Sequence, residues 1–483
     1  MKNFISDKRV LLSFLLILNS LAFTFYYGYR GILPIDSFTV YDPGYYVLNN
    51  FHPFKDYWSI TGPLLDYIQS LLFFLFGLNW FSYVLHAAFF SIFISLFSFY
   101  FFYKIGLNLL YSFIYSLGIS ILSYSSIGTP FADHHGVIFA LASLFSILLG
   151  ILYSKGIYWF LSVLFIILSF FCKQIPSAYL SIIFLFSTII YYFYIKVNKF
   201  NIIKYYLLSG LVFLLLLLLL TFAIGIPLEN FMTQYIFYPI SIGSERFVDL
   251  KIDINSFFIK FKFIHLSIVP LLISTWIIFF KKDKSIEDKK NLLIIFTVLI
   301  SALTFIYAQL LTMNQILIFF LIPSFLGMSH FFVERYYNRK YIIVLIILFL
   351  IGTTYKYHIR FNENKKFMEF QDIDYTLSVN AKNLDKSLSR LKWINSEFKD
   401  PLYEIDLLVE VKNILLNDKR RKILITDYQF FSSIIKNKTP SPSKFYDNRG
   451  VPLKNQKYFN TYKSFYISNC LLYTSDAADD SLR

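Results

Sequence analysis

Long apolar blocks separated by short polar segments run from the start of the chain to about residue 353. Most are long enough for a helix to cross about 30 Å of hydrocarbon, and Tyr205–Leu220 contains no charged residue. The pattern therefore predicts about eleven membrane-spanning helices. They are Val10–Tyr27, Trp80–Tyr103, Leu107–Tyr124, Val137–Tyr153, Tyr158–Cys172, Ser177–Ile195, Tyr205–Ile226, Ile264–Phe280, Leu292–Leu310, Ile316–Phe332 and Tyr341–Gly352.

A twelfth apolar block, Pro63–Gly77, is about one helical turn short of a comfortable span and carries Asp66 and Gln69. If this block does not cross and the N-terminus is cytoplasmic, every strongly basic short loop lies inside, including Lys281–Lys290. If it crosses, that cluster moves outside. We therefore expect an interfacial or re-entrant helix within the first outer loop.

The polar part of the chain follows the last span. Residues 1–353 are expected to form an all-α polytopic bundle, and residues 354–469 a small extracytoplasmic α/β portion. Within it, Arg421–Asp427 predicts a short buried strand and Tyr428–Ile435 a helix, whereas Thr439–Ser443 predicts a loop. These features predict a multi-pass protein of the cytoplasmic membrane with its C-terminal region outside.

Composition excludes a water-soluble globular protein and a nucleic-acid-binding protein. Hydrophobic residues make up 57% of the chain and charged residues only 16%, against about 25% charged in a soluble domain. The net charge of +15 comes from lysines in short loops, so it predicts orientation in a membrane and no nucleic-acid partner. Residues 470–483 resemble the translation of a sequencing adapter and are expected not to be native.

The first outer loop carries candidate chemistry in Asp42, which starts an Asp-Pro-Gly stretch rich in neighbouring tyrosines. Its carboxylate can be a solvated loop charge or can stabilise a turn. The aromatic neighbours favour packing against the bundle instead. Asp36 and Asp56 belong to the same loop and are most simply read as solvated charges, with an assisting role as the alternative.

A second candidate lies just before a predicted span, in Phe131-Ala-Asp133-His134-His135. One explanation is structural: Asp133 caps the helix and the histidines lie at the interface. The alternative is a divalent metal site, for Mn or Mg, in which Asp133 and His135 share one side of an extended segment and Asp42 is the third ligand.

Together these residues resemble the GT-C superfamily of membrane glycosyltransferases. The stretch Tyr41–Tyr46 is similar to a first-loop motif of an acidic residue followed by tyrosine. The stretch Pro53–Tyr67 with Phe76-Gly77 resembles bacterial relatives of protein O-mannosyltransferases and the aminoarabinose transferase. The stretch Phe131–His135 resembles the Asp-His-His motif of archaeal oligosaccharyltransferases.

The resemblance implies transfer of a sugar from a polyprenyl-phosphate donor to a glycan, lipid or protein acceptor, with Asp42 as catalytic base and metal ligand. Tyr45 belongs to the same motif and is a candidate substrate contact. Relatives often carry a phosphate-binding lysine where this chain has Thr61. Lys55, Lys173 or Arg246 are then candidate phosphate ligands, and spacing does not choose among them.

Two other functions stay open from the sequence. A flippase or transporter of lipid-linked saccharides should carry ionisable residues inside its spans, whereas here they gather in the outer loops. A polysaccharide polymerase or ligase usually has a large outer loop with Arg and His, whereas Asp dominates here. The Trp-Trp-Asp motif of oligosaccharyltransferases is absent from the sequence, which argues against N-glycosylation of proteins.

Overall fold

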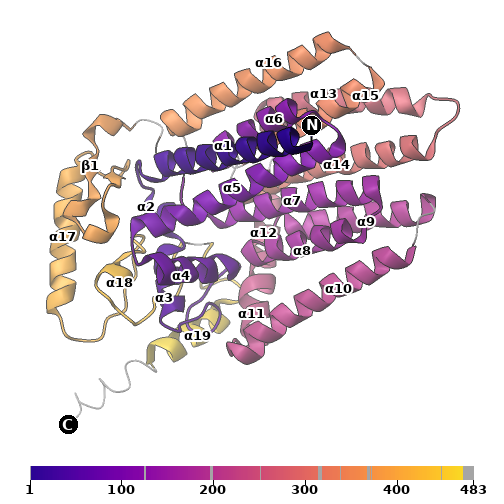
Figure 1. Ribbon diagram of the computed structural model, residues 1–483. Coiled ribbons are helices and arrows are strands. Elements are labelled where there is room, and N and C mark those ends of the chain that lie inside the picture. Colours follow the sequence, from indigo (N-terminus) through magenta and orange to yellow (C-terminus); the bar gives the residue numbers. More distant parts are fainter. Residues whose placement is uncertain are drawn as a thin grey trace.

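The structure, a computed structural model, is a bundle of long helices with a smaller region against one end (Figure 1). The chain starts in the bundle and finishes in the smaller region, beside α3 and α4. The residues described are 2–124, 127–195, 199–250, 252–313, 318–337, 339–366, 370, 373–447 and 449–471. The adapter-like segment therefore lies almost entirely outside the described residues.

Every predicted span coincides or overlaps with a helix of the bundle. The helices are α1 (Lys2–Gly28), α5 (Trp80–Ile105), α6 (Leu109–Leu122), α7 (Ala132–Tyr153), α8 (Gly156–Cys172), α9 (Ser177–Tyr194), α10 (Lys199–Leu218), α13 (Lys262–Phe279), α14 (Ile286–Thr312), α15 (Leu321–Tyr336) and α16 (Lys340–Tyr357). Short π-helical turns extend α10 as η1 (Leu219–Ala223) and α16 as η4 (His358–Glu363).

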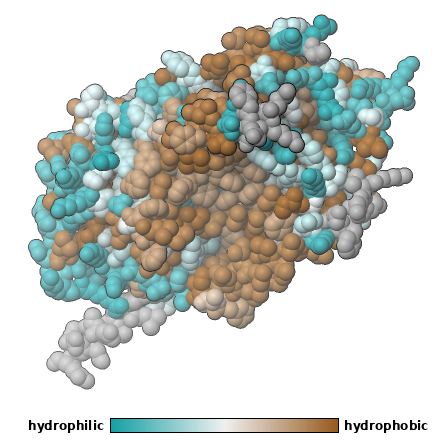
Figure 2. All heavy atoms as spheres, in the orientation of Figure 1, coloured by the Kyte–Doolittle hydropathy of each residue, from teal (hydrophilic) through white to brown (hydrophobic). Residues whose placement is uncertain are grey.

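Eight helices in the described part of the chain are long and apolar enough to span a membrane: α1, α5, α7, α9, α10, α13, α14 and α16. Several expose apolar side chains outward, and in the window of α10 with η1 only 11% of residues are buried. Figure 2 shows a broad hydrophobic surface over the bundle, with hydrophilic side chains toward its two ends. This distribution supports a multi-pass membrane protein.

The apolar block at Pro63–Gly77 forms α4 (Leu64–Phe76), a helix of 13 residues. At 1.5 Å per residue it is about 20 Å long, short of the hydrocarbon thickness. The indole Nε1 of Trp80, at the start of α5, donates a 2.8 Å hydrogen bond to the carbonyl of Gly28, at the end of α1. The connection containing α4 thus returns to the end of the bundle where it started.

Helix α7 is the centre of the bundle. Its residues from Asp133 to Ile151 are almost all buried, consistent with a sequence that is apolar on every side. It packs closely on α8: the hydroxyl of Ser169 donates to the carbonyl of Gly136 at 2.7 Å, and Gly150 lies against the ring of Trp159. This pairing fixes the start of α7 beside the end of α8.

Short elements build the rest of the molecule. The connections between bundle helices contain α2 (Pro34–Phe38), α3 (Tyr41–Leu48), α11 (Leu228–Phe231), η2 (Met232–Phe237), α12 (Tyr238–Asp249) and η3 (Ile254–Ile259). The C-terminal region contains η6 (Tyr375–Leu377), β1 (Val379–Asn380), η7 (Ala381–Asn383), η8 (Lys386–Leu388), β2 (Lys392–Trp393), α17 (Pro401–Asn417), α18 (Phe431–Ile434) and α19 (Phe459–Leu471).

The secondary structure of the C-terminal region was predicted only in part. The antiparallel pair of β1 and β2 is the one sheet among the described residues. The strand predicted at Arg421–Asp427 is wrong: the segment pairs with no described strand, Ile423 and Leu424 are half-buried, and Ile425 is exposed. The helix predicted at Tyr428–Ile435 is confirmed over α18, and the loop at Thr439–Ser443 is confirmed.

The C-terminal region is joined to the outer loops by backbone hydrogen bonds. The amide of Gly31 donates to the carbonyl of Lys392, and the amide of Lys392 donates to the carbonyl of Tyr29, both at 2.9 Å. Farther along, Trp58 pairs with the segment at Ser443. The first connection and the C-terminal region therefore form one structure over the end of the bundle.

Candidate functional site

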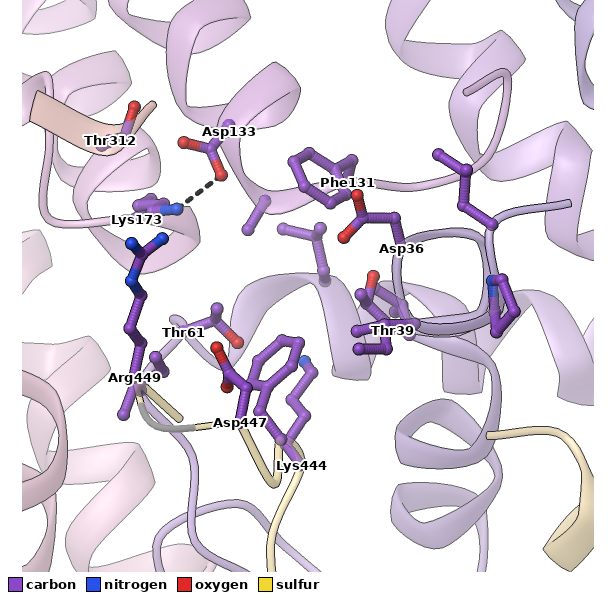
Figure 3. A pocket seen from close by; sticks show the side chains of 18 of the residues that line it. Asp36, Thr39, Thr61, Phe131, Asp133, Lys173, Thr312, Lys444, Asp447 and Arg449 are labelled. Atoms are coloured by element: carbon purple, nitrogen blue, oxygen red, sulfur yellow. Dashed lines mark hydrogen bonds and ion pairs between the residues drawn. The ribbon is translucent and has the colours of Figure 1, made fainter. Parts of the chain in front are cut away.

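A cavity of about 400 Å³ lies where the bundle, the first connection and the C-terminal region meet. The bundle contributes the start of α7, the end of α8 and the end of α14, while α2 and the start of α4 form a second wall. Residue 246 of α12 and the loops at 396–397 and 444–449 complete it. Figure 3 shows acidic and basic side chains from several of these elements facing one another across this space.

An ion pair lies in the wall formed by α7 and α8. The Lys173 ammonium is 2.5 Å from Oδ2 of Asp133. Asp133 belongs to the first turn of α7, where a carboxylate is favoured by the helix dipole, and Lys173 directly follows the last residue of α8. The Lys173 side chain is 22% exposed and that of Asp133 only 4%, so the lysine is the partner that a ligand in the cavity reaches.

Two arginines add positive charge beside this pair. Arg246 projects from α12, and in Figure 3 the guanidinium of Arg449 extends toward Lys173. Nε of Arg246 is buried and has no hydrogen-bond partner within the described residues. Burial and the neighbouring Arg449 lower the pKa of Arg246, while Asp133 and Asp447 act in the opposite direction. An anion bound here would supply the missing acceptor for Nε.

Carboxylates occupy other parts of the cavity wall. Asp36 reaches it from α2, a helix of five residues that starts with Pro34 at a position where proline is favoured. Figure 3 shows the Asp36 carboxylate pointing into the space across from Lys173 and Arg449. Asp447 and Glu397 come from the C-terminal region. The cavity therefore combines a cationic side with carboxylates that can accept a proton.

A largely apolar groove of about 520 Å³ adjoins this cavity, between α9, α12 and α14. Three pairs of consecutive residues have one member in each space, so the two share a wall: Lys173 with Gln174, Arg246 with Phe247, and Thr312 with Leu311. The groove continues along α9 and α14 into a third space that shares Tyr179 and Tyr307. An amphiphile can thus place a charged head in the cavity and a hydrocarbon tail against the bundle.

The structure places Asp42 away from the cavity. Its two carboxylate oxygens accept hydrogen bonds from the backbone amides of Ser432 and Ser433, each at 3.0 Å, at the start of α18. Asp42 is 4% exposed, and burial raises its pKa to about 7 while those amides act in the opposite direction. Its observed contacts join α3 to the C-terminal region, so the expected base does not face the site.

The predicted metal ligands are not brought together. Asp133 is paired with Lys173, Asp42 is bonded to α18, and the imidazole Nδ1 of His135 is hydrogen-bonded to the hydroxyl of Tyr124. The ring of His135 is fully buried against Phe90, with ring centroids 3.9 Å apart. Among the described residues no three His, Cys, Asp or Glu side chains form a cluster that fits a metal ion.

The remaining candidates divide between the cavity and other places. Lys173 and Arg246, both predicted as phosphate ligands, lie together in the cavity. Lys55 is exposed, and its ammonium donates to the carbonyl of Ile224 at 3.3 Å, outside the cavity. Tyr45 is buried in an aromatic cluster with other tyrosines and does not line the cavity.

Sequence reasoning missed the loop that contributes Asp447 and Arg449. A signal exists in Lys444-Phe-Tyr-Asp447-Asn-Arg449, where three charges follow a proline-rich loop. Comparison of the chain with protein-family models, curated proteins and solved structures found no match.

Proposed function

We propose that the chain is a membrane glycosyltransferase that takes a sugar from a polyprenyl-phosphate donor and transfers it to an extracytoplasmic acceptor. The observation that carries the proposal is a cavity with a cationic side that adjoins a largely apolar groove along α9, α12 and α14. The cavity suits a phosphate, and the groove suits a long hydrocarbon chain. A water-soluble nucleotide sugar would need no such groove.

The proposal includes the topology expected from the loops. The eight long helices, together with the shorter α6, α8 and α15, give eleven crossings, with α4 at the interface. An odd number of crossings separates the N-terminus from the C-terminal region. With the N-terminus in the cytoplasm, the cavity opens on the extracytoplasmic side, where the basic clusters are absent from the short loops of the sequence.

The cavity supplies the groups that the reaction needs. The bond between the anomeric carbon and the phosphate oxygen breaks, and its electron pair leaves with the phosphate. Lys173, Arg246 and Arg449 stabilise that charge. The acceptor oxygen forms the new bond to the anomeric carbon, and its proton passes to a carboxylate. Because Asp42 faces α18, we assign this role to Asp36, which faces the cavity.

The test is transfer in proteoliposomes with radiolabelled sugars on short polyprenyl phosphates. Asp36→Asn should lower kcat by about 10²-fold or more with donor binding retained. Arg246→Gln and Arg449→Gln should each weaken donor binding by about 10-fold or more, the range for a hydrogen bond to a charged group. Lys55→Gln, outside the cavity, should transfer like the wild type. Full transfer by Asp36→Asn would refute the assigned base.

A further inference from the structure

A second groove, of about 590 Å³, lies between α19 on one side and α11 with η2 on the other. In contrast to the cavity, none of the described residues that line it is charged. Most of its polar side chains are amides and hydroxyls, contributed by Asn230, Thr233, Asn460, Thr461, Ser464 and Ser468. We refer to it as the neutral groove. Its lining excludes the recognition of an anion by charge.

The polar side chains of the neutral groove have hydrogen-bonding capacity to spare. On α19, positions 460, 461, 464 and 468 follow the helical repeat and face one side. The side chains of Asn230, Thr233, Asn460 and Thr461 make no hydrogen bond to any other described residue. Each amide offers both donors and an acceptor, and each hydroxyl can donate or accept. Such pairs match the adjacent hydroxyl groups of a sugar ring.

An aromatic cluster forms the base of the neutral groove. Trp58 lies in edge contact with Tyr462 and Phe465, at centroid distances of 5.2 and 5.7 Å. Its indole Nε1 is buried without a hydrogen-bond partner among the described residues. Phe465 also borders the groove. The groove therefore combines a buried aromatic base with unpaired amides and hydroxyls along its sides, groups that can pair with the hydroxyls of an uncharged ring such as a hexose.

The neutral groove and the cavity lie on the two sides of one wall. Trp58 borders the groove, and Ile60, two residues farther along the chain, borders the cavity. Two residues of extended chain span about 7 Å. Trp58 is hydrogen-bonded to the neighbouring segment, whose Lys444 also borders the cavity. The linings of the groove and of the cavity are therefore only two residues apart along the chain at this wall.

We propose that the neutral groove binds the uncharged glycan part of the acceptor and so selects a saccharide as the acceptor of the transferase. This inference rests on the proposed function for the transfer step, but binding of the glycan itself does not. An acidic glycan would require cations, and none of the described lining residues is charged. The unpaired amides and hydroxyls distinguish this groove from the largely apolar one along α9, α12 and α14, which suits a lipid.

The test measures binding and chemistry separately on the purified full chain. Binding uses a panel of fluorescent neutral oligosaccharides built from hexoses and N-acetylhexosamines, read by fluorescence anisotropy. Chemistry uses hydrolysis of the polyprenyl-phosphate donor, in which water takes the place of the acceptor at the anomeric carbon and the sugar is released. The variant Thr233→Leu with Ser464→Leu fills the groove with apolar groups, and Asn460→Ala makes a milder change. The control is Lys463→Leu, on the same helix but outside the groove lining.

We expect at least one neutral oligosaccharide to bind, with affinity reduced about 10-fold or more in Thr233→Leu with Ser464→Leu and unchanged in Lys463→Leu. Donor release should be unchanged in all of these variants. Binding unaffected by the groove variants, or binding of a lipid or peptide acceptor with no glycan binding, overturns the inference. Glycan binding without donor release in any protein would overturn the proposed function and leave this inference standing.

Discussion

Two aspartate–lysine pairs of nearly equal length lie at the end of the bundle, and their surroundings differ. The ammonium of Lys173 is 2.5 Å from Asp133, and that of Lys444 is 2.6 Å from Asp66. The first lysine side chain is 22% exposed and the second only 2%. The distance alone therefore does not distinguish a pair that can bind a ligand from one that holds the fold; access to the cavity does.

The pair of Asp66 and Lys444, which we call the closed pair, joins α4 to the C-terminal region. The carboxylate of Asp66 also accepts a hydrogen bond from the hydroxyl of Tyr57 at 2.9 Å, so both of its oxygens have partners. Although Lys444 borders the cavity, its ammonium is directed to Asp66. The pair of Asp133 and Lys173, which we call the open pair, has two arginines beside it and no comparable enclosure. We therefore expect changes to the pair of Asp66 and Lys444 to reduce stability, and changes to the pair of Asp133 and Lys173 to reduce transfer.

The largest expected effect is on stability, in Lys444→Met. Removing one partner of a buried ion pair leaves an uncompensated charge at Asp66 and should cost about 3–5 kcal/mol of unfolding free energy. The measurement is thermal unfolding in detergent, at a pH near neutrality. Adding Asp66→Asn to Lys444→Met removes that charge and should recover most of the loss. A wild-type unfolding temperature in Lys444→Met would show that the pair does not hold the region.

The open pair should respond in the opposite way. Lys173→Gln removes a cation from the phosphate site and should lower transfer about 10-fold to 100-fold, since a hydrogen bond to a charged group contributes about 1.5–3 kcal/mol. Arg246 still interacts with Asp133 and Lys173 is partly exposed, so the unfolding free energy should change by less than in Lys444→Met. Transfer kinetics and thermal unfolding of the same preparation check both parts. A stability loss as large as that of Lys444→Met would place Lys173 with the closed pair.

Asp42 provides a third buried aspartate, without a lysine, and the smallest expected effect. Because burial raises its pKa to about 7 in the folded protein, the folded state binds its proton more tightly than the unfolded state. The stability associated with that proton is complete below about pH 4 and is lost as the pH rises through 7.

The expected loss is about 1 kcal/mol per pH unit between pH 5 and 7. Unfolding temperatures measured over this range should fall in the wild type, and the slope should be smaller in Asp42→Asn. Equal slopes in the two proteins would mean that the proton on Asp42 does not control docking of α18.

Much of the bundle could be predicted because the hydrocarbon thickness requires long apolar segments, and each such segment formed a helix at or near its predicted position. The short length of α4 was also predictable, since the apolar block at Pro63–Gly77 is itself about one turn short of a comfortable span. The strand at Arg421–Asp427 failed for a physical reason: a short run of apolar residues forms a strand only when a neighbouring strand pairs with its backbone hydrogen-bonding groups. The sequence of a segment does not show whether it has such a neighbour.

The site was predicted only in part, because contacts between distant parts of the chain leave no local pattern in the sequence. Lys173 was one of three candidate phosphate ligands, and the structure puts it in the cavity. Asp42 matched a motif, but its carboxylate meets amides nearly 400 positions later in the chain, at Ser432 and Ser433. No local pattern reports a contact of that kind. Arg449 was missed because a charged residue in a loop is usually solvated, and only its approach to Lys173 distinguishes it.

The central claim, that the cavity and its groove hold a polyprenyl phosphate, is tested most directly by photocrosslinking. A polyprenyl phosphate that carries a diazirine on an isoprene unit near the phosphate is bound to the protein in proteoliposomes and irradiated. The crosslinked residues are then identified by mass spectrometry. We predict crosslinks on the groove side chains of α9, α12 and α14, such as Tyr179, Ile240 and Tyr307, reduced by about 10-fold or more in Arg246→Gln. Crosslinks confined to other faces of the bundle, or unchanged in that variant, would contradict the claim.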